Sequence, residues 1–191
     1  TNQMPDLNFK MKIREGYIKY DGAPFPASNL FLNLQTDIPA INPDSLHIKI
    51  DSIFFNVDKD YLSAIIETKG INNPTVKAKL NASMDLEKLD QALGLPNIDL
   101  KGKCDVQLTA NGLYANGPNP SSIRHELTTL SIPSYNLNAD VKDGYLKYAA
   151  LPQSITGINF NVKSSCADSD YKNIGFSINN FSAIALKNFI K

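Results

Sequence analysis

Apolar and polar residues alternate along most of this 191-residue chain, and this period of two constrains the fold more than any other feature. Phe9, Met11 and Ile13 are separated by single cations, so an extended backbone would place them on one face. The longest alternating run covers residues 98–110, enough for a strand of about 40 Å. Shorter runs occupy residues 29–35, 46–51, 62–66 and 76–80. The pattern predicts long strands with one apolar face.

The sequence also repeats itself at an offset of 128 residues. Residues 16–24 are GYIKYDGAP and residues 144–152 are GYLKYAALP, and the match continues without a gap in both directions. Apolar class is kept better than identity, which is typical of two segments with the same packing requirement. We therefore expect one β-rich unit over residues 1–191, made of repeat 1 (residues 7–113) and a partial repeat 2 (residues 135–191).

Turn signals separate the alternating runs. Glu15-Gly16 and Asp143-Gly144 predict tight hairpin turns in which glycine supplies a positive φ. The residues after each glycine would form the returning strand, and Pro24 or Pro152 would end its pairing. Further turns are expected at Asp21-Gly22, Lys69-Gly70, Asn73-Pro74 and residues 116–120.

One segment has a helical period instead. Leu86, Leu89 and Leu93 predict a short amphipathic helix near residues 84–93 that covers an opening or an edge of the sheet. Ser83 or Asp85 can cap its start, and Gly94 with Pro96 can end it. The spacing in residues 181–190 is compatible with either a strand or a short terminal helix.

Composition and motifs argue against several functions. The formal net charge is zero, with 19 basic and 19 acidic residues, so nothing favours a nucleic-acid partner. The chain has no catalytic, phosphate-binding or metal-binding motif, and we expect no catalytic residue, cofactor or metal. His47 and His125 are interpreted as surface residues, and the acidic residues Asp51, Asp58, Asp60 and Glu67 as solvated.

The two cysteines, Cys104 and Cys166, leave two alternatives open. Neither belongs to a C-x-x-C pair, which favours two free thiols, one of them a small buried apolar residue. An oxidising compartment would allow them to form a disulfide.

The apolar strand face has to be covered by a second sheet, by the helix, by a partner or by a ligand. The predicted fold is therefore mainly all-β, with long antiparallel strands in a curled sheet or an open sandwich, two related repeats and one short amphipathic helix. Alternation alone leaves open whether the inward residues form a core or an apolar groove. These candidate residues are Leu30, Leu32, Leu34, Leu46, Ile48, Ile50, Leu100, Val106, Leu108, Ile158, Phe160 and Val162.

Several phrases of the chain resemble the repeating unit of AsmA-like proteins. They are GYIKY followed by a proline in residues 16–24, NLFLNL in residues 29–34, NASMDLEKLD in residues 81–90, and LKGKCDVQLTANG in residues 100–112. In that family a strand phrase ending in Asp-Leu runs into a short helix and then a Leu-x-Gly strand. The resemblance covers residues 7–181 and carries no catalytic motif.

The resemblance implies a non-enzymatic periplasmic β module of a large Gram-negative envelope protein, anchored to the inner membrane in its full length. It implies a role in outer-membrane biogenesis, with phospholipid acyl chains sheltered or guided along an apolar groove. The 191 residues would be a fragment of a longer chain. The partners would be phospholipid, the remainder of that longer chain and envelope proteins. The alternative is a structural or adhesive cell-surface β domain that binds protein or glycan through its loops.

Overall fold

A computed structural model describes residues 4–21, 24–118, 127–185 and 188–190 of the protein. Its main feature is one ten-stranded antiparallel sheet in which neighbours in the sheet follow the order of the chain. The strands are β1 (Leu7–Ile18), β2 (Ala27–Ile38), β3 (His47–Val57), β4 (Asp60–Lys69), β5 (Thr75–Asp85), β6 (Ile98–Leu113), β9 (Ser134–Tyr148), β10 (Ile155–Cys166), β11 (Gly175–Ala185) and β12 (Asn188–Ile190). Between β6 and β9, strands β7 (Ala115–Pro118) and β8 (Leu127–Ser131) form a separate two-stranded hairpin.

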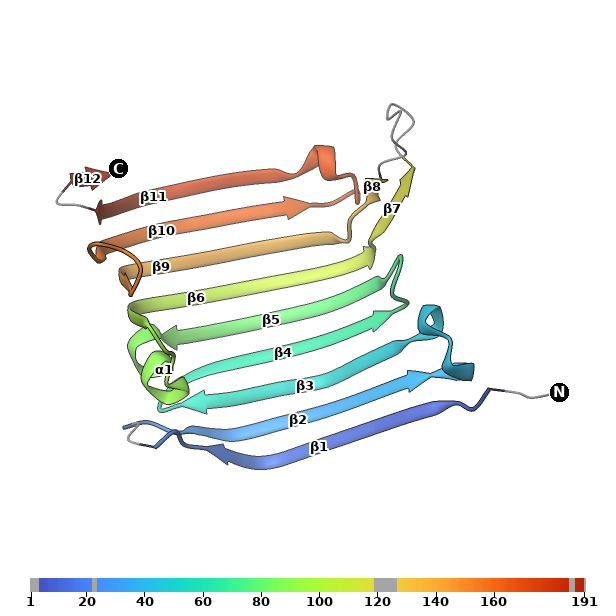
Figure 1. Ribbon diagram of the computed structural model, residues 1–191. Coiled ribbons are helices and arrows are strands. Elements are labelled where there is room, and N and C mark those ends of the chain that lie inside the picture. The colour runs from blue at the N-terminus through green and yellow to red at the C-terminus, as the bar shows by residue number, and fades with distance from the viewer. Residues whose placement is uncertain (1–3, 22–23, 119–126, 186–187, 191) are drawn as a thin grey trace.

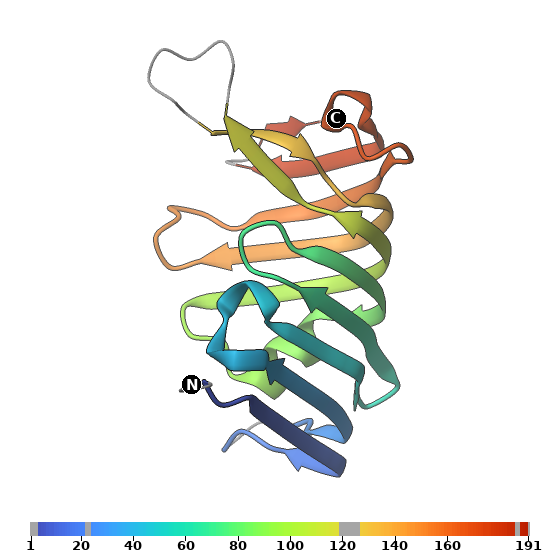
Figure 2. The same ribbon diagram turned by 90° about the vertical axis from the view of Figure 1, so that its right-hand side faces the viewer.

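The sheet forms a single curved layer (Figures 1 and 2). Helix α1 (Leu86–Leu93) lies across one end of the strands, inside the curve. At about 4.8 Å per strand, the concave face extends about 40 Å from β1 to β11. This architecture confirms the predicted fold class, in its curled-sheet form rather than as a sandwich. β6 is 16 residues long, longer than the run that predicted it.

Helix α1 begins and ends at residues expected from the sequence. The Asp85 carboxylate accepts hydrogen bonds from the backbone amides of Glu87 and Lys88, and Gly94 closes the helix in the left-handed conformation. Beneath α1, Ala27, Val57, Met84 and Ala92 form a buried cluster. The best-covered part of the sheet therefore lies under this helix.

The predicted hairpin turns at Glu15-Gly16 and Asp143-Gly144 are wrong. β1 continues through Gly16 to Ile18, and β9 continues through Gly144 to Tyr148. Each dipeptide forms a β-bulge, where the pairing register shifts while the strand goes on. The positive φ also belongs to Glu15 (54°) and Asp143 (51°) rather than to the glycines. An acidic residue followed by glycine suits both a hairpin and a bulge, so the dipeptide could not separate them.

The glycines of the two bulges are required by close packing. A Cβ on Gly16 would lie 2.8 Å from Ile13 Cγ2 and 3.0 Å from Leu30 Cβ. A Cβ on Gly144 would lie 3.1 Å from Val141 Cγ1 and 2.9 Å from Ile158 Cβ. Val141 and Ile158 are 128 positions after Ile13 and Leu30. The repeated glycine therefore marks a place where neighbouring strands approach too closely for any side chain.

Further irregularities recur at the same offset. In the strand that pairs with each bulged strand, Asn29 of β2 and Gly157 of β10 both have positive φ. The third strand of each set is bulged as well, between Ile50 and Ile53 in β3 and around Asn180 in β11. The 128-residue period thus covers backbone irregularities as well as side-chain class.

The other predicted turns and the C-terminal segment agree with the structure in part. The turn at Lys69-Gly70 is present, with Gly70 at a φ of 83°. Residues 181–185 and 188–190 are strands, which settles the open choice for the C-terminal segment. The predicted loop at residues 116–120 is wrong for its first three residues, which belong to strand β7, while residues 119–120 lie outside the described residues. No helix in the described part of the chain is long and apolar enough to cross a bilayer.

Candidate functional site: the concave apolar face

The pairing register places the predicted inward residues on one face of the sheet. In repeat 1, Leu32 lies opposite Ile13 and Ile53, and Leu34 lies opposite Met11 and Ile50. At the centre of the sheet, Leu108 lies between Leu80 and Leu137. This face is the concave one, because it carries the buried cluster beneath α1.

The same ladders continue into repeat 2. Phe160 lies opposite Val141, and Val162 lies between Ala139 and Ile178. The others that share this face are Leu30, Ile48, Ile50, Leu100, Val106 and Ile158. Leu46 is the exception, because it lies just before β3 begins and is outside the strand ladders.

All twelve candidate residues are half-buried, neither sealed in a core nor fully open to solvent. In the described residues no second large sheet faces them, and α1 covers only one end. Near the two edges the apolar side chains become more exposed: Phe9 is 55% exposed on β1, and Phe176 is 63% exposed on β11. The concave face is therefore an open apolar trough.

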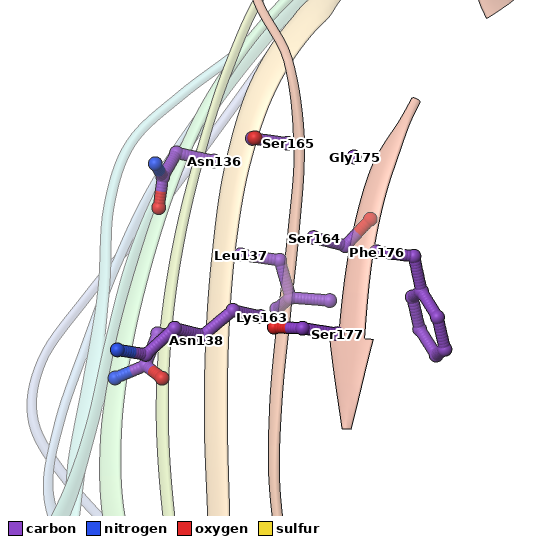
Figure 3. Close-up of a pocket in the computed structure, with 9 residues that line it drawn as sticks. All are labelled: Asn136, Leu137, Asn138, Lys163, Ser164, Ser165, Gly175, Phe176 and Ser177. Carbon is purple, nitrogen blue, oxygen red and sulfur yellow. The ribbon is translucent and has the colours of Figure 1, made fainter. Parts of the chain in front are cut away.

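The opposite, convex face is polar. Figure 3 shows Asn136, Asn138 and Lys163 extending to one side of the sheet, while Leu137 and Phe176 extend to the other. The nine residues labelled in Figure 3 line a shallow depression of about 540 Å³ at β9, β10 and β11. Lys103 and Asp105 of β6 are also exposed on this face. The two faces differ sharply in their chemistry.

Sequence reasoning missed one polar contact inside the trough. The Tyr135 hydroxyl lies 2.8 Å from Ser164 Oγ, and Ser164 is only 9% exposed. Register places Ser164 opposite Leu137, where alternation alone would expect an apolar side chain. Serine at such a position gives no signal in the sequence, because its partner Tyr135 is 29 residues away.

Both cysteines are free in the structure. Cys166 is 1% exposed, and its Sγ lies 3.3 Å from the Asp170 carbonyl oxygen. Cys104 lies in the trough opposite Met84 and Val141, and burial raises the pKa of its thiol. The Cys104 thiol therefore lacks the lowered pKa that would make it a reactive nucleophile.

His47 is less isolated than the sequence indicated. Its Nε2 lies 3.0 Å from Glu67 Oε1, and its Nδ1 lies 3.9 Å from Asp37 Oδ2. The hydrogen bond with His47, helped by Lys69, lowers the pKa of the Glu67 carboxyl. These groups tie together β2, β3 and β4 on the convex face. His125 lies outside the described residues.

The other acidic residues do not converge on one site. Asp58 and Asp60 lie beside Lys88 of α1, and Asp51 pairs with Lys49. Among the residues that the structure describes, no group of three or more His, Cys, Asp or Glu could hold a metal ion. The acidic side chains thus act as partners of single cations.

Comparison of the chain with protein-family models, with curated proteins and with solved structures found no match in any of the three.

Proposed function

We propose that this chain is a non-enzymatic β module of the bacterial periplasm that supports outer-membrane biogenesis by sheltering phospholipid acyl chains along its concave face. One observation carries the proposal: the trough is apolar, continuous across the sheet and uncovered over most of its length. In water such a surface is costly, at about 25 cal/mol per Å² of apolar area. A ligand that covers it would recover this free energy.

An acyl chain fits the dimensions and chemistry of the trough. One leaflet of a bilayer contributes about 15 Å of hydrocarbon, well within the length of about 40 Å from β1 to β11. Each methylene moved from water to an apolar surface contributes about 0.8 kcal/mol. The trough is also open at the two sheet edges, so a chain could enter along its axis while its headgroup stays in water.

The test is lipid extraction followed by mass spectrometry of the protein purified from a Gram-negative host. We expect phospholipid to accompany the wild-type chain. Val162→Glu places a charge in the trough and should reduce the bound lipid about tenfold, whereas Lys163→Glu on the neighbouring convex position should not. Circular dichroism on both variants separates lost binding from lost folding. Equal lipid content in the two folded variants would contradict the proposal.

A second candidate is a structural or adhesive domain that binds protein or glycan. The polar depression at β9–β11 is the observation that favours it, because Asn, Ser and Lys side chains can hydrogen-bond hydroxyl groups. Glycan-array binding that is lost in Asn138→Ala and retained in Val162→Glu would support this alternative.

A further inference from the structure

The two long edges of the sheet are protected to different degrees. On β1 the exposed cations Lys10, Lys12 and Arg14 line the convex side of the edge, which discourages pairing with another strand. β11 contains no charged residue and no proline. Within the described part of the chain, residues 175–182 of β11 pair with β10 alone, so their other side is a free edge.

Strand β12 shows which kind of strand suits that edge. It pairs with the last three residues of β11 in the register Ala183–Ile190, Ile184–Phe189 and Ala185–Asn188. Subtracting 128 from both residue numbers of each pair gives Phe55–Leu62, Asn56–Tyr61 and Val57–Asp60. These are the pairs nearest the turn between β3 and β4. β12 therefore occupies the position of the first three residues of β4.

The rest of the β3–β4 ladder defines the chemistry of a strand that would suit this edge. Ile50 lies opposite Ile66, and Ile53 lies opposite Ala64. The equivalent positions on β11 are Ile178 and Phe181, which are 51% and 41% exposed. A strand with small or branched apolar residues at alternate positions would cover both side chains and extend the trough.

We propose that residues 175–182 form a docking edge for an extended strand that continues β12 antiparallel to β11 and has the apolar–polar alternation of β4. The edge supplies unpaired backbone groups for affinity, and the exposed apolar side chains supply specificity for the alternation. This inference is independent of lipid binding, since it concerns backbone pairing at the edge.

A second copy of the chain is the competing occupant. β1 and β11 run in the same direction, so an antiparallel pairing of two copies that keeps their concave faces on one side must join like edges. Joining two β1 edges would bring six cations together, which is unfavourable. Joining two β11 edges carries no such penalty, and this dimer would occupy the proposed docking edge.

The test uses the full chain with Lys191 replaced by a copy of residues 63–69, so that the added strand follows Ile190 as Ser63 follows Leu62. Hydrogen exchange in residues 175–182 should slow about tenfold or more relative to the unextended chain. The matched control inserts one alanine before the same seven residues, which reverses the faces of the added strand. In the control, and in β1 of both chains, exchange should not change.

Equal protection in the extended chain and its control, or none in either, would overturn the proposal. Analytical ultracentrifugation of the unextended chain provides the second readout. A stable dimer whose residues 175–182 already exchange slowly would also overturn it, because the edge would then belong to a second copy. A monomer with fast exchange at these residues is the expected result.

Discussion

Strands β1–β3 and β9–β11 share one backbone design but differ in what surrounds them. Their bulges and close approaches coincide at an offset of 128 residues, down to the atoms that crowd Gly16 and Gly144. In β2 and β3, however, Ala27 and Val57 belong to the buried cluster beneath α1. No helix in the described residues covers β9–β11. The same bulges and close approaches therefore form in β9–β11 without a helix over them.

The convex faces of the two repeats also differ. His47 and Asp37 of repeat 1 correspond to Gly175 and Ser165 of repeat 2. The first pair contributes to the ionic group that joins β2, β3 and β4. The second pair is too small to reach across, and it lines the polar depression of Figure 3. The repeat thus preserves the backbone irregularities and the inner apolar face, while the side chains of the outer face differ.

Alanine substitutions at Met84 and Val162 should distinguish the covered part of the trough from the uncovered part. Met84 is 5% exposed beneath α1, and Met84→Ala should lower the free energy of unfolding by about 2–5 kcal/mol, as cavity formation in a core does. Val162→Ala, at a half-buried position in repeat 2, should lower the free energy of unfolding by less than about 1.5 kcal/mol. Urea denaturation measures both. Equal losses would mean that the β9–β11 face is as well covered as the core under α1.

The next effect tests whether the two bulges are equivalent. Gly16→Ala and Gly144→Ala should each destabilise the protein by about 1–3 kcal/mol, because a Cβ at either position collides with the neighbouring strand. Thermal unfolding of the two variants should show similar losses. If alanine at either position left the thermal stability unchanged, the two bulges would not be structurally equivalent.

The smallest effect concerns the ionic group of repeat 1. The pKa of Glu67 is lowered by its hydrogen bond to His47, so this contact stabilises the fold above the ordinary Glu pKa of 4.5. The contribution is lost as the pH falls through the lowered value. The stability difference between wild type and His47→Gln, measured by urea denaturation, should therefore shrink below about pH 4. For the exposed control Lys79→Gln, the difference should stay constant across this range.

Much of the fold could be predicted because alternation and repetition are local properties of the sequence. The strand faces and the helix follow from residue spacing, and Asp85 is one of the two caps that the sequence offers. The inward position of residues such as Leu32 and Phe160 follows from the period of two. The bulges could not be separated from hairpins, because Glu15-Gly16 fits both until the partner of the next residues is known. The Tyr135–Ser164 contact and the group around His47 join residues far apart in sequence, and single-residue patterns carry no signal for such pairs.

Site-specific photo-crosslinking can show whether acyl chains lie in the open trough of the concave face. A photoreactive residue replaces Leu32 or Phe160 in the trough, and Asn33 or Asn161 on the opposite face serves as the matched control in each repeat. Illumination in cells followed by mass spectrometry should give phospholipid adducts at Leu32 and Phe160 and none at the two asparagines. Absence of lipid adducts at both trough positions, or equal adducts on both faces, would contradict the claim.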